Sequence, residues 1–557
     1  MAASVESERA AERGGTFAPL REPAFRSIWT ASLFSNFGQL ILGVGAAWEM
    51  TRLSSSPSMV ALVQTAMMIP LMLVALPAGA IADMFDRRKI ALTGLGFAAL
   101  SSATLSLLSF LDLTTPWVLL VFCVLIGAGV ALYGPSWQAS ISEQVSSKNL
   151  PAAVALGTIS YNVARSFGPA LGGLIVLAAG AKAAFGINAA AYIPLWLAFF
   201  AWQRKHTPSR LPPERIDRAI ISGARYALHS PLVRTVLTRS FMFGLAGATS
   251  SALAPLIAKD LLKGDAATFG ILLGATGIGA VLGALFVSRI RERMSDEAAV
   301  RMLALMTSIA LVITGMSRWL PVTCACFFVI GACNILTVAM LNVSVQLSAP
   351  RWVTARALSL FSSALTAGIG IGAWAWGVVA AYQGLGFAVV ASGFAVAVTV
   401  LLGLVLPLKR QEEIDTNSVD IGYEPEVALG LTLRSGPIVI EVEYDVDPDR
   451  AREFYDVMMK VQRARNRIGA FDWSISRDIA DPALWIERYH CPTWGDYLRM
   501  RSRYTQTEFE VQEMADSYNR TGHGHRVRRR LERPFGSVRW KAESPDPHQD
   551  NVGYIGP

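Results

Sequence analysis

Residues 71–93 read LMLVALPAGAIADMFDRRKIALT and join two apolar segments through a short charged turn. Gly79 and Asp83 are four residues apart, so on a helix they share one face, and Arg87 and Arg88 follow at the start of the next segment. A glycine lets a second helix approach closely, and a carboxylate at a membrane edge needs a basic partner or the N-terminal amides of a neighbouring helix. The turn therefore predicts a contact that holds helix ends together. The alternative is that its basic residues only keep the turn in the cytoplasm.

This turn also resembles a known family. The segment Gly79-Ala-Ile-Ala-Asp83-Met-Phe-Asp86-Arg87-Arg88-Lys89 is similar to the loop 2–3 signature of the major facilitator superfamily. It departs from that signature at Met84 and Asp86, a variant that resembles the branch holding enterobactin exporters and macrolide efflux proteins. The resemblance implies that Asp83 and Arg87 clasp the cytoplasmic ends of helices in the outward-open state. We call the following residues of this turn the latch: Gly79, Asp83, Asp86, Arg87 and Arg88.

Composition agrees with a membrane protein. Of 557 residues, 52% are hydrophobic and 17% charged, and the mean hydropathy is +0.39, so the apolar content exceeds what one soluble core can bury. The net charge of +8 comes from basic residues between the apolar segments, where they set topology, so we expect no nucleic acid partner. The five cysteines show no metal-ligand spacing and no disulfide framework, and we expect no metal and no cofactor. No phosphate-binding GxxxxGK[ST] sequence is present, so an ion gradient is the expected energy source.

Twelve apolar segments are long enough to span a membrane, at about 20 residues each. They fall into two sets of six with a weak internal repeat, in which Val287 stands where the second half would carry the counterpart of Asp83. The predicted spans are 27–50, 58–82, 90–111, 117–139, 153–179 and 182–202, then 235–258, 267–288, 299–315, 320–346, 356–381 and 385–407.

The charge distribution predicts that both termini are cytoplasmic, with roughly 23 Lys and Arg inside against about 5 outside. The combination of a transporter with a soluble tail resembles the bacterial transmembrane secretion effector branch, which implies a bacterial inner membrane. The expected organisation has seven parts. They are a cytoplasmic tail at 1–26, a six-helix bundle at 27–202, a basic linker at 203–234, a second bundle at 235–408, a linker at 409–436, an α+β domain at 437–535 and a disordered tail at 536–557.

The fifth span carries small residues and a proline. Such residues allow close backbone approach, and a proline inside a span removes a hydrogen bond and kinks the helix. The GPxxGG part resembles the fifth-helix signature of exporters and antiporters in the same superfamily, whereas an ordinary small-residue packing face is the alternative. The predicted exporter-type kink comprises Ala164, Gly168, Pro169, Gly172 and Gly173.

Polar residues inside spans are candidates for a substrate pathway, because each is costly in lipid, although Asn and Gln also join helices to one another. The candidates are Asn36, Gln39, Gln64, Gln138, Asn162, Arg165, Asn188, Arg239, Asn334 and Asn342. For Arg165 and Arg239, snorkelling to the membrane surface is an equal alternative. Glu49 is the candidate for coupling to an ion, expected to be a proton, and the alternative is a rim carboxylate paired with Arg52.

The last hundred residues change character. IVIEVEYDV alternates polar and apolar residues, and the expected order of strand, helix, two strands, helix and strand is the ferredoxin-like arrangement. This tail resembles the antibiotic-biosynthesis-monooxygenase-like fold, which usually forms dimers, so a homodimer through this domain is expected. His490, Tyr489, Trp473 and Trp485 would be the residues of a catalytic site there, but barrel packing and strand surface explain them better.

The sequence thus predicts an all-α membrane protein with twelve transmembrane helices in two six-helix bundles, plus a C-terminal α+β ferredoxin-like cytoplasmic domain. The predicted function is export of a small molecule, such as a siderophore or drug, by an ion-driven transporter of the major facilitator type that uses alternating access. We expect no catalytic residue. The alternative is a membrane-tethered enzyme or ligand sensor that acts through its monooxygenase-like domain.

Overall fold

A computed structural model describes residues 17–84, 86–146, 149–203, 224–350, 353–408, 427–501, 503–520 and 526–532. Side chains at 74–84 and at 139, 142, 151, 155, 158, 166, 288, 347 and 355 lie outside this description. The chain forms two compact units. The first comprises residues 1–220, 235–344 and 358–409, and the second comprises 221–234, 345–357 and 410–557.

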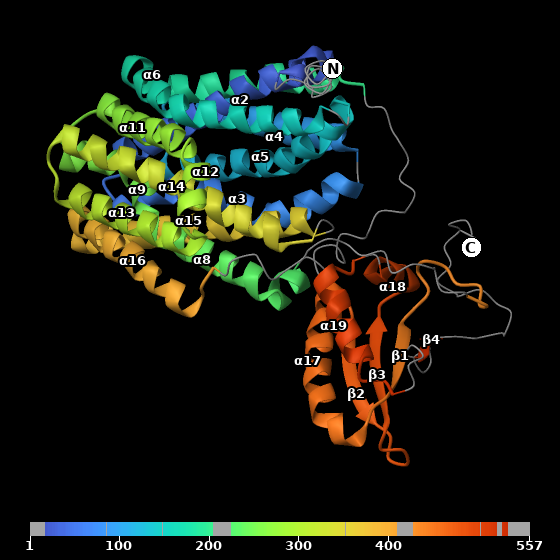
Figure 1. The fold of residues 1–557 in the computed structure, drawn as a ribbon. Coiled ribbons are helices and arrows are strands. Elements are labelled where there is room, and N and C mark those ends of the chain that lie inside the picture. Colours follow the sequence, from blue (N-terminus) through green and yellow to red (C-terminus); the bar gives the residue numbers. More distant parts are fainter. Residues whose placement is uncertain are drawn as a thin grey trace, which may run out of the picture. The chain divides into compact units, whose positions relative to one another are not determined.

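The first unit is a set of long helices that run side by side (Figure 1). The first half consists of α2 (Pro23–Leu53), α3 (Pro57–Met84), α4 (Arg87–Phe110), α5 (Pro116–Gln144) and α6 (Leu150–Ala201). The second half begins with α8 (Pro231–Gly247), α9 (Thr249–Ala252), α10 (Ala254–Leu256) and the π-helical turn η2 (Ile257–Leu261). It continues with α11 (Ala266–Ala284), α12 (Val287–Arg293), α13 (Asp296–Met316), α14 (Leu320–Ser348), α15 (Thr354–Gln383) and α16 (Leu385–Val405). A short 3-10 turn, η1 (Ala18–Arg21), precedes α2.

Eight helices of the described residues are long and apolar enough to cross a membrane: α4, α5, α6, α11, α13, α14, α15 and α16. The predicted spans at 27–50, 58–82 and 235–258 correspond to α2, α3 and the series from α8 to η2. Large apolar side chains on the helices are exposed, for example Leu100 at 67% and Leu404 at 71%. Such exposure fits a lipid-facing surface. The unit is therefore a multi-pass membrane bundle, and the number of twelve crossings stays a prediction.

Local sequence explains where the helices begin and end. Thr115 caps α5 by accepting a hydrogen bond from Val118 N at 3.3 Å, and Ser295 caps α13 in the same way through Ala298 N.

The predicted fifth and sixth spans are joined as α6, whose one non-helical residue is Gly180, with φ +76°. Glycine adopts this conformation without the strain that a Cβ brings. This break falls between the predicted spans 153–179 and 182–202, and the kink at Pro169, inside the helix, stays a prediction.

Glycines set the distance between α11 and α14. A Cβ on Gly279 would lie 3.0 Å from Phe328 Cα, and one on Gly331 would lie 2.9 Å from Thr276 Cα. Since both neighbours are backbone atoms, neither can move without shifting a helix. The two helices therefore touch backbone to backbone, as helices in membranes do where small residues face each other.

The second unit contains a four-stranded antiparallel sheet in the order β2-β3-β1-β4. Its elements are β1 (Ile438–Asp445), η4 (Pro448–Arg450), α17 (Ala451–Ile468), β2 (Phe471–Arg477), β3 (Leu484–Cys491), α18 (Trp494–Arg501), α19 (Gln506–Asp516) and β4 (Arg526–Leu531). The observed order agrees with the expected one, except that the second helical region is divided into α18 and α19. The ferredoxin-like assignment and the predicted domain boundaries stay predictions.

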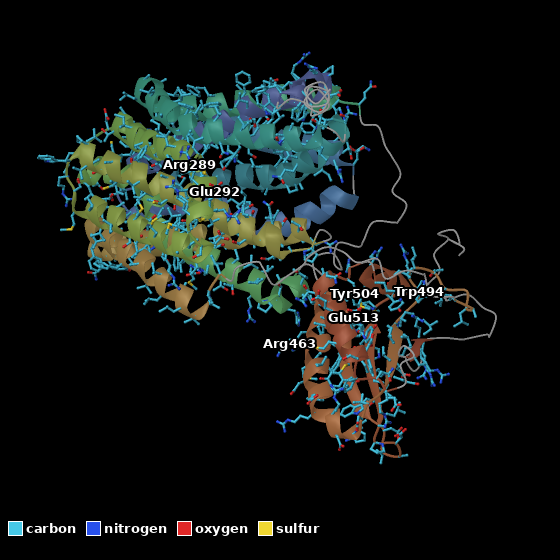
Figure 2. The ribbon with its side chains drawn as sticks, viewed as in Figure 1. Arg289, Glu292, Arg463, Trp494, Tyr504 and Glu513 are labelled. Carbon is cyan, nitrogen blue, oxygen red and sulfur yellow. The ribbon has the colours of Figure 1, made fainter. Side chains whose placement is uncertain are left out.

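The core of the second unit lies between one face of this sheet and the helices. Ile440, Val442 and Tyr444 alternate along β1 toward this core, where Phe454 and Met458 of α17 meet them. Trp494 and Tyr504, labelled in Figure 2, are buried in the same cluster at 8% and 6% exposure. The alternation explains the period-two pattern seen in the sequence.

We predict that Gly331→Ala destabilises the first unit, because the added methyl group meets the backbone of α11. Overpacking of this kind costs about 1–3 kcal/mol, so the melting temperature of the purified chain should fall. Gly134→Ala is the matched control, since a Cβ at Gly134 meets no atom within 4 Å. Equal melting temperatures for the two variants, measured in the same detergent, would contradict the close helix contact.

Candidate functional site

The two halves of the first unit meet at one end, where α2 and η2 end and α11 begins. We call this the sealed end. Gly173 of α6 faces Gly270 of α11, and a Cβ on Gly270 would lie 2.8 Å from Gly173 Cα. Trp48 stacks on Phe269, with ring centroids 6.2 Å apart. Lys259 of η2 donates a hydrogen bond to Thr51 O at 2.7 Å. Residues from both halves thus close this end.

Helices α3 and α15 add a second line of contact between the halves. The Thr65 hydroxyl donates to Gly370 O at 2.8 Å. Near the sealed end, a Cβ on Gly377 would lie 3.1 Å from Ser58 Cα, so here too a glycine brings two helices together.

The packing of buried apolar side chains differs between the two ends of the first unit. Two buried clusters near the sealed end combine residues of both halves: one joins Leu42 and Met50 to Leu253 and Ala388, and the other contains Val44 together with residues of η2 and α11. At the opposite end, the described clusters each stay within one half. They contain Ile28, Leu95 and Phe199 in one case, Phe25 and Leu156 in another, and Val300, Leu336 and Met340 in the third. Among the described residues, the buried apolar clusters therefore join the halves at one end and stay separate at the other.

The latch lies at that opposite end, and the structure shows what its basic residues bind. Arg87 Nη1 pairs with Glu143 Oε1 of α5 at 3.0 Å, and both side chains are largely buried. Arg88 donates from Nε to Phe199 O at 3.0 Å and also bonds Phe200 O, so it caps the last turn of α6. Cations are favourable at helix C-termini because the exposed carbonyls carry partial negative charge. The latch arginines thus hold the ends of α5 and α6.

The acidic part of the latch is described in part. The Asp86 carboxylate caps α4 by accepting from Arg88 N at 2.9 Å and Lys89 N at 3.4 Å. The surroundings of Gly79 and the side chain of Asp83 lie outside this description. Glu143, the partner of Arg87, was not among the sequence candidates. A single carboxylate at the inner end of the fourth span was the signal that could have indicated it.

The small residues of α6 serve two contacts. Gly168 lies against Leu40 and Gly172 against Val44, so both face α2, whereas Gly173 faces α11. Ala164 is fully buried, and Pro169 is half-buried within the continuous helix. The predicted exporter-type segment therefore packs α2 within its own half and reaches the other half at one glycine.

The pathway candidates divide into engaged and unengaged side chains. Asn36 donates to Ser160 Oγ at 3.3 Å, Asn188 to Ser102 Oγ at 2.9 Å, and Asn162 and Asn342 are each engaged by a neighbouring residue. The others have no polar partner among the described residues and are half-buried, apart from Gln138, which is exposed. These unengaged residues are Gln39, Gln64, Gln138, Arg165 and Asn334. Unpaired polar groups in a membrane helix need water or a ligand.

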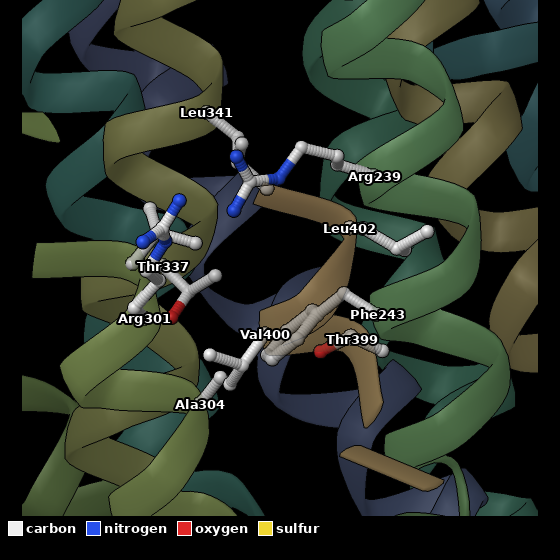
Figure 3. A pocket seen from close by; sticks show the side chains of 10 residues that line it. Arg239, Phe243, Arg301, Ala304, Thr337, Leu341, Thr399, Val400 and Leu402 are labelled. Carbon is white, nitrogen blue, oxygen red and sulfur yellow. The ribbon is translucent and has the colours of Figure 1, made fainter. Parts of the chain in front are cut away.

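Arg239 is held in an ion-pair cluster within the second half. It pairs with Glu297 Oε2 of α13 and donates to Leu406 O at 3.3 Å, while Arg301 pairs with Glu297 Oε1 at 2.6 Å. Leu408 N also donates to Glu297, at 3.0 Å. Figure 3 shows the adjoining cavity of about 10 Å³, lined by Arg239, Arg301 and Thr337, which has room for about one water molecule. The sequence did not single out Glu297.

Glu49, the coupling candidate, is 4% exposed near the sealed end. Its carboxylate pairs with Arg52 at 2.8 Å, and that arginine side chain is 64% exposed. This is the pairing that the sequence offered as the alternative to a coupling role.

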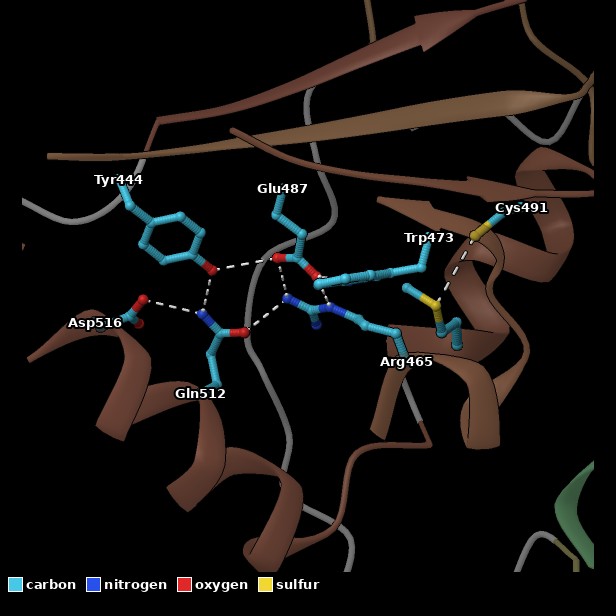
Figure 4. Close-up of polar contacts among 8 residues, drawn as sticks. Tyr444, Arg465, Trp473, Glu487, Cys491, Gln512 and Asp516 are labelled. Carbon is cyan, nitrogen blue, oxygen red and sulfur yellow. Dashed lines mark hydrogen bonds and ion pairs between the residues drawn. The ribbon is translucent and has the colours of Figure 1, made fainter. Parts of the chain in front are cut away.

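The polar groups at the core of the second unit form a closed network (Figure 4). Glu487 is fully buried and accepts from Arg465 Nε at 3.0 Å, Trp473 Nε1 at 2.9 Å and the Tyr444 hydroxyl at 3.2 Å. Gln512 binds Arg465 and Tyr444 as well. Burial opposes the charge on Arg465, but the Glu487 carboxylate outweighs it and raises the pKa of Arg465 well above its ordinary value.

The residues considered for catalysis in this domain belong to packing. Tyr489 lies beneath the Arg465 guanidinium at 4.9 Å, and His490 Nε2 is 3.4 Å from Glu532 on the strand surface. Trp473 is bound to Glu487, and Trp485 contacts Phe454 with ring centroids 5.7 Å apart. Two ring nitrogens of this set, Trp485 Nε1 and His490 Nδ1, are buried with no hydrogen-bond partner among the described residues.

Comparison with known proteins decides the family. The model of the transmembrane secretion effector family matches residues 14–535. The chain belongs to this family. Relatives of this chain include the enterobactin exporter EntS of Escherichia coli O1:K1 and of Shigella boydii serotype 18, each 26% identical over 393 residues, covering 69% of this chain and 92% of the relative.

Solved structures agree in fold. A bacterial homologue of the human lysosomal transporter Spinster, in an inward-facing and unoccupied conformation, matches with a TM-score of 0.55 and 13% identity, covering 70% of this chain and 96% of its own. The POT family transporter PepTSo matches with a TM-score of 0.56 and 12% identity, covering 69% of this chain and 97% of its own. This family member is thus a multi-pass membrane transporter of the major facilitator type and not an enzyme.

We predict that Glu487→Ala destabilises the second unit by about 3–5 kcal/mol, because Arg465 is left as an unpaired buried charge. Arg530→Ala is the control, since it removes only an exposed pair with Glu441 (2.7 Å) and should cost less than about 1 kcal/mol. Denaturant unfolding of the full chain, followed by tryptophan fluorescence, measures both. Similar losses in the two variants would show that the network does not stabilise the core.

Proposed function

We propose that this protein is a secondary active exporter of a small siderophore-like or drug-like molecule that works by alternating access. The observation that carries the proposal is the asymmetry of packing: an apolar core shared by both halves at the sealed end, and separate cores at the latch end. Two rigid halves joined at one end can rock and expose a central pathway to each side in turn.

The sidedness follows from charge. The latch end carries the basic turn of residues 86–89, and basic residues favour the cytoplasm, so both termini lie there and the sealed end faces outward. The structure then corresponds to an inward-open state of a bacterial inner membrane protein. Arg87 pairs with Glu143 of its own half in this structure. The resemblance to the major facilitator superfamily implies that Asp83 and Arg87 clasp the cytoplasmic helix ends in the outward-open state.

The unengaged polar side chains supply a substrate pathway. Gln39, Gln64, Arg165 and Asn334 come from α2, α3, α6 and α14, in both halves, and each needs a polar partner that the described residues do not provide. A substrate with several polar or anionic groups fits this set. The exporters named among the relatives handle enterobactin, which makes a siderophore the first substrate to test.

Energy coupling and assembly complete the proposal. A proton gradient drives transport, and Glu49 near the sealed end is the carboxylate that protonation could free from Arg52.

A homodimer through the second unit would use the open sheet face, which bears the pairs Arg528–Glu443 at 3.1 Å and Arg530–Glu441 at 2.7 Å. Such a polar interface weakens with added salt.

The test is export of enterobactin by Escherichia coli cells that lack their own enterobactin exporter and express this chain. We expect extracellular enterobactin to rise, and the rise to disappear when a protonophore collapses the gradient. Arg87→Gln should lower export by about tenfold at equal membrane abundance, which is a loss of about 1.4 kcal/mol at the latch. Arg318→Gln is the control, because Arg318 bonds only the carbonyl of neighbouring Ser317 among the described residues. Full export by Arg87→Gln would contradict the role of the latch.

A further inference from the structure

A small cavity lies inside the second half, between α8, α13, α14 and α16 (Figure 3). Its volume is about 10 Å³, so it holds a particle about as large as one water molecule and excludes a carboxylate or a phosphate. Its walls are apolar apart from two arginines, Arg239 and Arg301, and two threonines, Thr337 and Thr399. All of the lining residues belong to the second half, so the cavity is separate from a pathway between the halves.

Positive charge exceeds negative charge around this cavity. Arg239 and Arg301 share one carboxylate, Glu297, and both of its oxygens are occupied. Oε1 accepts from Arg301 Nε at 2.6 Å, and Oε2 accepts from Arg239 and from Leu408 N, the latter at 3.0 Å. Among the described residues, no second acidic side chain lines the cavity or pairs with either arginine. One positive charge is therefore left without a counter-ion in the described part of the chain.

The ends of the surrounding helices do not supply the missing negative charge. The start of α13 and the end of α16 meet here, because Glu297 accepts from Leu408 N and Arg239 donates to Leu406 O. A helix start carries partial positive charge and a helix end partial negative charge, so the two dipoles offset each other. The surplus of one guanidinium remains.

Arg239 also has donors to spare. The residue is 5% exposed, and its Nη1 donates to Glu297 and to Leu406 O, whereas Nε and Nη2 have no polar partner among the described residues. These two nitrogens keep some open surface, unlike the Thr337 hydroxyl, which is closed off and unpartnered. Because Arg239 lines the cavity, this surface is available to a particle inside it. A nearly buried guanidinium with free N–H groups favours an acceptor that carries negative charge.

Arg301 contributes the second positive charge and a route to solvent. Its Nη1 and Nη2 have no polar partner among the described residues, and its side chain is 33% exposed. Their common partner Glu297 keeps the guanidinium groups of Arg301 and Arg239 close together, and Figure 3 shows both groups at the same end of the cavity. A water molecule would fill the space but leave the charge surplus. A halide ion is singly negative, spherical and little larger than water, so it meets both requirements.

We propose that this cavity binds a chloride ion between Arg239 and Arg301. The bound ion supplies the missing counter-charge, since a buried charge is costly unless it is paired. It also ties α8 to α13 beside the existing contact of both arginines with Glu297. The site stands on the cavity and its charges alone and does not depend on the proposed export function.

The test is thermal unfolding of the full chain in nanodiscs of neutral lipid, in sodium chloride and in sodium gluconate at equal concentration. Gluconate carries the same charge as chloride but is too large for the cavity. We expect chloride to raise the melting temperature by about 2 °C relative to gluconate, with an effect that saturates. Equal melting temperatures in the two salts would show that water alone occupies the cavity and would overturn the site.

Two substitutions and a matched control locate the ion. Arg301→Gln removes the surplus positive charge and leaves Arg239 paired with Glu297, so the difference between the salts should disappear even if the melting temperature itself falls. Glu297→Gln removes the competing carboxylate, so the chloride concentration that gives half of the effect should fall about tenfold. Arg293→Gln removes the same charge at an exposed position, the end of α12, and should keep the original difference.

A chloride effect that survives Arg301→Gln, or that Glu297→Gln weakens, would overturn the assignment to this cavity. Because chloride binding is read by unfolding and export by extracellular enterobactin, failure of this site and failure of the proposed exporter are distinguished.

Discussion

The contact between Gly173 and Gly270 is the constraint on which the first unit depends. With no side chain on either residue, α6 and α11 approach backbone to backbone across the two halves. In a membrane, where lipid is as apolar as the protein surface, such close packing of small residues is a main source of helix association. The Trp48 and Phe269 rings and the hydrogen bond from Lys259 surround this contact and close the same end.

At the other end, each half is braced within itself. Arg88, the second residue of α4, holds the last carbonyls of α6, and Glu297, the second residue of α13, holds the end of α16 through Leu408 N and through Arg239. The first half uses a cation, Arg88, and the second half an anion, Glu297, and each is the second residue of its helix. The second half lacks a counterpart of Asp83, and Glu297 gives it a different brace. Rigid halves with one shared end are what a rocking motion requires.

Much of this could be predicted from the sequence. The apolar lengths gave helices close to those observed, and the period-two pattern of residues 438–446 indicated β1. The pairing of Glu49 with Arg52 was foreseeable, because the residues are three apart on one helix. Partners distant in sequence were not foreseeable: Arg87 and Glu143 are 56 residues apart, and Arg239 and Glu297 are 58 apart. The conformation of Gly180 was not foreseeable either: the spans were expected to separate near it, but its positive φ, which is free of strain in glycine, is seen only in the structure.

Distances between spin labels at the two ends of the first unit test the central claim most directly. One pair, at Ser55 and Lys263, reports the sealed end, and the other, at Gln203 and Arg293, reports the latch end; all four positions are exposed. In nanodiscs with and without substrate, the account predicts that a longer Ser55–Lys263 distance always accompanies a shorter Gln203–Arg293 distance. Distances that stay fixed, or that change in the same direction at both ends, would contradict it.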